Sequence, residues 1–207
     1  MRYSKEHKAR TYEKILQIAC RCFHERGING VSVADVMAAA GLTHGAFYSY
    51  FASKDSLIAE AVKHGLEQRR QSLEKWGRNA RDGQCALEVI IRNYLSRLHR
   101  DDPATGCPIP ALGAEIARGG TKARTALTSK LKEIVGLLAG FAERGSAQEG
   151  QVKSIGLLSA LVGAMVLARA TNDADFSDAI LRASRSFLFE TLPRSKKRRP
   201  RSRRPMG

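Results

Sequence analysis

Apolar residues recur at helical spacing along most of this chain, and no stretch keeps the alternating β-branched pattern of a strand. In residues 11–27, Ile15, Ala19 and Phe23 repeat every four positions, and Gly27 follows as a natural helix stop. No Asn-Gly hairpin joins two strand-like runs. The sequence therefore predicts an all-α protein.

Caps and breakers place the other helices. Ser32 and Ser53 have the N-cap pattern, and the helix after Ser53 is expected to end at Gly77. Thr43 is positioned to cap a short helix that begins at His44. Further helices are expected at 84–99, 108–118, 122–144, 151–170 and 177–192.

The charge of the chain indicates a polyanionic partner. The formal net charge is +15, and the last fourteen residues contain eight Lys or Arg and no acid. Removing those eight charges leaves +7 on the rest of the chain. Nucleic acid or an anionic membrane surface would suit such a charge.

The polar N-terminus and the lack of an 18-residue apolar run indicate a cytoplasmic protein with no membrane partner.

The four cysteines do not form a metal-binding pattern. Cys20, Cys22, Cys85 and Cys107 show no CxxC spacing, so we expect reduced thiols and no metal. Cys20 and Cys22 are interpreted as core residues, and Cys85 as buried and inert. Paired histidines in a local motif, a phosphate-binding glycine loop and a carboxylate cluster are all missing from the sequence. We therefore expect neither an enzyme nor a cofactor.

Two short helices joined by AGLT predict a helix-turn-helix. Phe47 and Phe51, four residues apart, share the inward face of the second helix. His44 and Tyr48 share another face, where polar-tipped rings would have no use inside a core. Hydroxyls and a helix N-terminus suit phosphate oxygens, and small residues beside them let the backbone approach base edges.

Residues 11–62 resemble the DNA-binding domain of the TetR family of bacterial transcriptional repressors. The resemblance is carried by Ile15, Ala19, Phe23, Gly27, Ser32, Val33, Ala40-Gly41-Leu42, the run from Gly45 to Phe51, and the run from Ser53 to Leu57. It implies a double-stranded DNA operator as the partner.

The resemblance also assigns individual residues. Phosphate contacts fall on Ser32, Thr43, Tyr48 and Lys54, and base contacts fall on His44, Gly45 and Ala46. His44 departs from the lysine that is often found at its position, which weakens one charge contact. The basic residues Arg2, Lys5, Lys8 and Arg10 resemble an N-terminal DNA-binding arm, or they form a solvated charged segment.

TetR-like proteins are usually homodimers, whose last two helices form a four-helix bundle. A stripe of small residues in 151–170 would allow such close packing, or it is buried within one subunit: Gly156, Ser159, Ala160, Gly163, Ala164 and Ala168. The expected organisation is a helix-turn-helix domain with its arm at 1–52, a connecting helix with an effector-binding and dimerisation domain at 53–192, and a basic disordered tail at 193–207.

The effector is harder to predict, because a sensor pocket has no required motif. Asn93, Tyr94, His99 and Phe141 are possible linings. Cys107 precedes Pro108 at a helix N-terminus, where the helix dipole favours a thiolate. This Gly-Cys start is similar to that of a TetR subgroup, in which the cysteine either senses electrophiles or is structural.

Together these features predict a homodimeric repressor that a small-molecule or thiol-reactive effector releases from a near-palindromic operator. The alternative is an architectural DNA-binding protein that relies on its basic tail and has no inducer.

Overall fold

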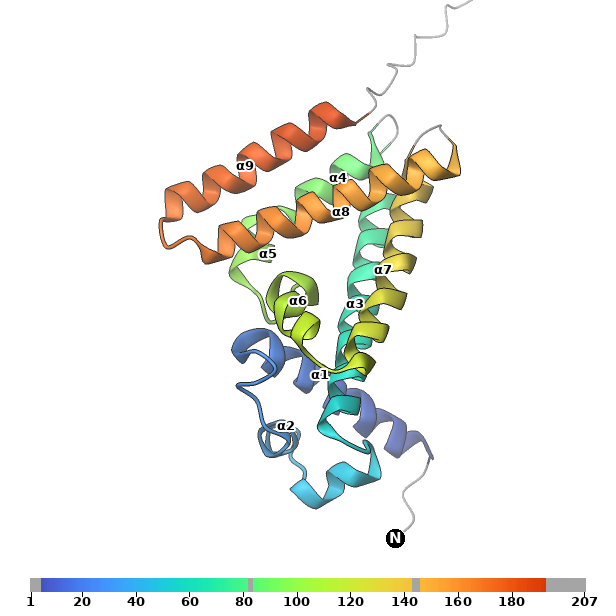
Figure 1. The fold of residues 1–207 in the computed structure, drawn as a ribbon, viewed down its shortest axis with the longest axis vertical. Helices are drawn as coiled ribbons and strands as arrows, with labels where there is room; N and C mark the ends of the chain where they lie inside the picture. Colours follow the sequence, from blue (N-terminus) through green and yellow to red (C-terminus); the bar gives the residue numbers. More distant parts are fainter. Residues whose placement is uncertain (1–4, 82–83, 143–145, 193–207) are drawn as a thin grey trace, which may run out of the picture.

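The computed structural model describes residues 5–81, 84–142 and 146–192, and these residues contain helices and no β-strand (Figure 1). In chain order the elements are α1 (Lys5–Arg26), α2 (Val33–Ala39), the 3-10 helix η1 (His44–Ser49), α3 (Lys54–Arg78), α4 (Ala86–Tyr94), α5 (Arg97–Asp101), α6 (Pro108–Arg118), α7 (Thr121–Phe141), α8 (Ala147–Ala170) and α9 (Ala174–Thr191). The all-α prediction is confirmed.

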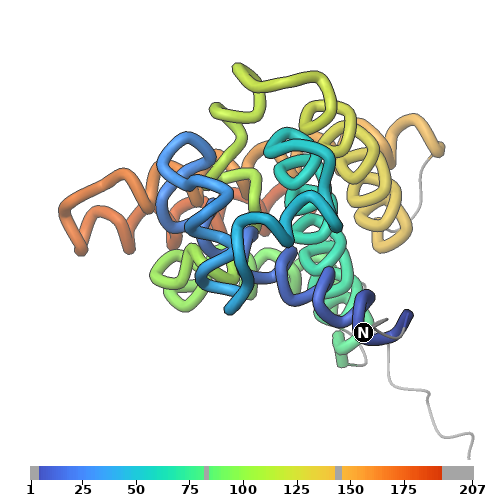
Figure 2. The backbone as a smooth tube through the Cα atoms, turned by 90° about the horizontal axis from the view of Figure 1, so that it is seen from below, coloured from blue at the N-terminus to red at the C-terminus, as the bar shows by residue number. Residues whose placement is uncertain are grey.

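The helices form a small N-terminal unit and a larger helical body. In Figure 1, α1, α2 and η1 lie at the lower end, and α3 rises from them beside α7. Helices α8 and α9 run side by side at the opposite end of the molecule. Figure 2, the view from below, looks onto the N-terminal unit, with the blue segments in front of the body.

Aromatic rings hold the N-terminal unit together. The Tyr12 ring in α1 stacks on Phe51 with ring centroids 5.1 Å apart, and Phe51 stacks on Phe47 at 5.6 Å. Phe47 and Phe51 are buried, as the sequence predicted. This stack fixes η1 and the chain after it against α1.

Two helix boundaries differ from the prediction. Helix α3 continues through Gly77, because α7 packs so closely there that a Cβ would lie 2.5 Å from the Phe141 ring. The expected helix 84–99 is two helices, since Leu95 leaves the helical conformation and Ser96 caps α5 through the His99 backbone N–H.

Two further caps start α8 and α9 earlier than predicted. Ser146 and Glu149 form a capping box, so α8 begins before residue 151. Asp173 accepts a hydrogen bond from the Phe176 backbone N–H, so α9 begins before residue 177. Arg2 and the basic segment 193–207 lie outside the described residues.

Glu115 in α6 joins the body to the N-terminal unit. Its Oε2 accepts hydrogen bonds from the backbone N–H groups of Ile28 at 2.9 Å and Asn29 at 3.2 Å. Gly27 ends α1 with a φ of +74°, and a Cβ there would lie 2.7 Å from the Glu115 Oε1. A carboxylate of the body therefore holds the turn that links α1 to α2.

We predict that Glu115→Ala lowers the free energy of unfolding by about 1–3 kcal/mol, because it leaves two backbone donors without their carboxylate. Urea unfolding followed by circular dichroism measures the change. The control is Glu25→Ala, which removes an exposed carboxylate 3.7 Å from Arg21 and should cost about 0–1 kcal/mol. Equal losses in the two variants would contradict a joining role for Glu115.

Candidate nucleic-acid interface and effector site

The turn between α2 and η1 depends on one glycine. Gly41 has a φ of +73°, and the next backbone N–H, that of Leu42, donates to the Met37 carbonyl at 2.9 Å. This hydrogen bond ends α2, and the left-handed glycine turns the chain toward η1. Gly41 thus lies just beyond the C-cap of α2, Ala40.

His44 and Tyr48 lie on the outer side of η1. The Tyr48 side chain is 66% exposed, whereas Phe47 beside it is only 1% exposed. The His44 and Tyr48 rings meet edge-on at 6.0 Å, and Phe47 supports Tyr48 at 5.3 Å. The short helix thus buries one ring and presents two others to a partner.

The small residues Gly45 and Ala46 leave the backbone of η1 accessible from outside. A Cβ added to Gly45 would meet nothing within 4 Å, so packing within the described chain does not require glycine there. Ala46 is half-buried next to it. A second molecule could therefore approach the backbone of η1 closely.

Ser32 and Asp35 form a complete capping box at the start of α2. The Ser32 hydroxyl accepts from the Asp35 backbone N–H at 3.1 Å and donates to the Asp35 carboxylate at 2.7 Å. Hydrogen bonds from Ser32 hold the pKa of Asp35 below its usual value. A phosphate contact from Ser32 would require this hydroxyl to rotate away from the carboxylate.

The other predicted contact residues surround η1. Thr43 is exposed at the N-cap, but its side chain makes no hydrogen bond to the first turn. Lys54 begins α3 and is partly exposed. Lys8, with Lys5 and Arg10, lies in the first turns of α1, and its ammonium lies 5.9 Å from the centre of the Tyr50 ring.

The candidate effector residues lie on different sides of α4. Tyr94 is fully buried, and Cys107 is 1% exposed at the N-cap of α6. Asn93 is exposed, and its amide donates to the Val89 carbonyl of its own helix at 2.8 Å. The fold therefore brings Tyr94 and Cys107 together and leaves Asn93 outside.

His99 organises the polar interior around Cys107. Its Nδ1 donates to the Tyr94 carbonyl at 2.7 Å, and its Nε2 accepts from the Cys107 backbone N–H at 3.1 Å. Burial, followed by the Arg69 charge, lowers the pKa of His99 to about 4. The ring is therefore neutral at pH 7, with its proton on Nδ1.

The other cysteines have separate surroundings. Cys20 and Cys22 are buried as predicted, and burial raises the pKa of the Cys20 thiol to about 12. Cys85 is only partly buried at the N-cap of α4, so the expectation of full burial was wrong. Within the described residues, no three His, Cys, Asp or Glu side chains gather as metal ligands.

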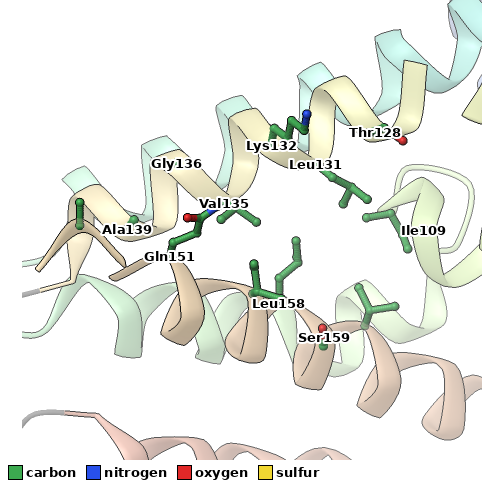
Figure 3. A pocket seen from close by; sticks show the side chains of 13 residues that line it. Ile109, Thr128, Leu131, Lys132, Val135, Gly136, Ala139, Gln151, Leu158 and Ser159 are labelled. Carbon is green, nitrogen blue, oxygen red and sulfur yellow. The ribbon is translucent and has the colours of Figure 1, made fainter. Parts of the chain in front are cut away.

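One cavity of the body was not predicted from the sequence. It has a volume of about 590 Å³ and lies between α6, α7 and α8. Its walls are mainly apolar, and Leu131, Val135 and Ile109 extend into the space between the helices in Figure 3. Gln151 and Ser159 supply polar groups. None of the predicted linings Asn93, Tyr94, His99 and Phe141 contributes to it. The apolar positions of α7 were the available signal, but core packing gives the same pattern.

Comparison with known proteins relates the N-terminal unit to a family of regulators. Residues 15–61 match the sequence model described as bacterial regulatory proteins, tetR family. This N-terminal segment belongs to the TetR family. The chain is therefore a transcriptional regulator, and its relatives are regulators rather than enzymes.

Relatives match this chain over different shares of its length. The HTH-type transcriptional regulator Rv0196 of Mycobacterium tuberculosis is 26% identical over 87% of this chain and 95% of its own length. The HTH-type transcriptional repressor KstR2 of Rhodococcus jostii is 30% identical over 38% of each chain. The structure of FadR from Bacillus subtilis in complex with stearoyl-CoA shares the fold, with a TM-score of 0.68 and 16% identity over 88% of this chain and 100% of that one.

We predict that Tyr48→Phe weakens operator binding by about 1.5–3 kcal/mol, roughly 10- to 150-fold, because it removes a hydroxyl proposed to donate to a charged phosphate. Fluorescence anisotropy on an operator found by selection from random DNA measures the loss. The control is Tyr12→Phe, whose hydroxyl bonds Glu60 at 3.3 Å within the protein. Unchanged affinity in the Tyr48 variant would remove this residue from the contact set.

Proposed function

We propose that this TetR-family regulator is a homodimeric repressor, which a small-molecule or thiol-reactive effector releases from a near-palindromic operator. The observation that carries the proposal is the exposed His44–Tyr48 face of η1, held outward by the buried Phe47. In this proposal Ser32, Thr43, Tyr48 and Lys54 contact phosphates, and His44, Gly45 and Ala46 face the bases.

Repression and DNA binding have independent support. The formal net charge of +15 favours a polyanion. KstR2, which is similar to this chain over 38% of its length, is named as a repressor. The family places such regulators in the bacterial cytoplasm, so we propose that location here as well.

The outer faces of α8 and α9 support a dimer. Val152 and Leu167 on α8 are 65% and 59% exposed, and Phe176 and Phe187 on α9 are 60% and 64% exposed. Large apolar side chains grouped on one exposed face are unfavourable in water and mark interaction surfaces. A second copy that covered them would place two η1 helices on one DNA face, as a palindromic operator requires.

Small residues on α8 agree with close helix packing. Added Cβ atoms at Gly156 and Gly163 would meet nothing within 4 Å, so both face outward, while Ala164 and Ala168 are buried inside the chain. The predicted small-residue stripe is therefore divided between the two sides of α8.

Among the described helices, α8 alone has the length and mean hydropathy, 1.7, of a membrane span. Core helices of soluble proteins also pass this test.

The cavity between α6, α7 and α8 is the proposed effector pocket. Its 590 Å³ and its apolar walls with a few polar groups suit a small, largely apolar molecule. Since α6 also carries Glu115, a ligand that moves α6 would disturb the turn after α1. A coupling of about 1–3 kcal/mol would change operator affinity roughly 5- to 150-fold.

Cys107 offers a second route to release. Its thiol lies at the N-cap of α6, close to the Tyr94 hydroxyl, but only 1% of the residue is exposed. An electrophile would therefore have to enter through a local opening. The alternative to both routes, an architectural protein without an inducer, has less support because the larger body contains a cavity for a ligand.

We predict that Phe187→Glu raises the dimer dissociation constant about 30-fold or more, since a charge would replace an interface ring and a hot-spot loss is about 2 kcal/mol or more. Sedimentation equilibrium measures the association. Leu98→Glu is the matched control, because Leu98 is 81% exposed on α5, outside the proposed interface. An unchanged dimer in the Phe187 variant would exclude this face.

The function is tested by anisotropy with the selected operator and a scrambled duplex at about 150 mM salt, near the physiological range. Wild type and Cys107→Ser are measured before and after a thiol-reactive electrophile. We expect specific binding in both proteins, with electrophile-induced release only in wild type if Cys107 is the sensor. Binding that ignores the electrophile would assign release to the apolar pocket. Equal affinity for both duplexes would favour the architectural alternative.

A further inference from the structure

Two arginines enter the interior beside the α6 N-cap without an acidic partner. Arg69 of α3 is only 7% exposed, and it donates to the Thr105 carbonyl and to His99, both at 3.4 Å. Arg169 of α8 donates to the Arg100 carbonyl at 3.2 Å and the His99 carbonyl at 2.5 Å. Within the described residues, each guanidinium thus binds neutral groups.

Several donors in this region have no partner among the described residues. Arg69 Nε, Arg169 Nη1 and the Tyr94 hydroxyl are buried and make no hydrogen bond there. Tyr94 is itself fully buried. Buried polar groups in folded proteins are nearly always paired, and the two arginine nitrogens can only donate. The cluster therefore requires an acceptor.

An anion would satisfy these donors, and the geometry restricts its approach. Rings cover Arg69, with the guanidinium carbon 5.4 Å from the centre of the Trp76 ring and 5.7 Å from that of Tyr94. The edge of the guanidinium carries the unpaired Nε. Carboxylate and phosphate oxygens bind a guanidinium in its plane, along such an edge. His99 is neutral and adds no competing charge.

A polar hollow lies beside Arg69. It measures about 390 Å³ and is formed by α3 and the segment before α6, with Arg69, Lys75, Gln68, Gln71, Ser72 and Thr105 among its linings and no acidic residue. Gly106 also lines it, and a Cβ there would lie 2.8 Å from Arg169 Nη2. The glycine thus lets the second guanidinium lie directly behind the wall of the hollow.

We propose that this hollow binds a compact oxyanion, the carboxylate or phosphate group of a small molecule, with Arg69 as its principal ligand. Lys75, Gln68 and Ser72, which also line the hollow, supply further donors. The site is separate from the apolar cavity between α6, α7 and α8, since the two share no lining residue.

The test is thermal unfolding of the full chain without DNA, in increasing sodium phosphate or, separately, sodium acetate. Sodium chloride keeps the ionic strength constant, so the reference is chloride. We expect the unfolding midpoint to rise and saturate with at least one of the two anions. In Arg69→Gln the apparent dissociation constant should be at least about tenfold weaker, because a buried charge contact is lost. The response to phosphate against acetate identifies the preferred oxyanion.

The control Arg21→Gln removes an exposed arginine, whose side chain is 67% accessible, and should leave the response unchanged. A midpoint that neither anion raises above chloride would overturn the proposal, and so would an equal rise in Arg69→Gln. Should that variant fail to fold, Lys75→Gln, which removes an exposed charge that lines the hollow, decides. A weakened anion response in it supports the site, and a full response overturns it. Since no DNA is present, the outcome does not depend on the operator.

Discussion

The continuous helix α3 is the constraint on which the rest of the structure depends. At about 1.5 Å per residue, its 25 residues span roughly 38 Å. Leu57 and Ile58 at its start are buried with the N-terminal unit, and Arg69 and Leu73 are buried within the body. Since helix hydrogen bonds resist bending, a displacement of either end is carried to the other. Glu115 adds a second connection, through α6.

The sequence was most informative where local chemistry decides the structure. Ser32 and Ser53 cap their helices, Gly27 and Gly41 adopt the left-handed conformation, and Pro108 opens α6 as expected. The division of the rings around η1 also agreed with the prediction, although η1 is a 3-10 helix, in which residues three apart share a face. Each of these features involves residues close together in the chain.

The rest depends on contacts between distant segments. Nothing near Glu115 in the sequence indicates that it binds the turn after α1. Nothing near Arg69 indicates a buried guanidinium whose Nε has no partner among the described residues. The cavity forms only where α6, α7 and α8 meet, so its lining residues cannot be recognised from the sequence around each of them. The prediction that α3 ends at Gly77 was wrong for the same reason. The glycine makes room for the Phe141 ring, which comes from another helix.

The contact between Gly77 and Phe141 restricts how the body can move. The ring occupies the space of the absent side chain, so sliding α3 along α7 would drive backbone against ring before any new packing formed. Lys130 of α7 also bonds Glu67 of α3 at 2.8 Å. Shear between these helices is therefore blocked, and the pair should travel as one rigid lever. A hinge motion then has to occur on the opposite side, where α6 and α8 border the cavity.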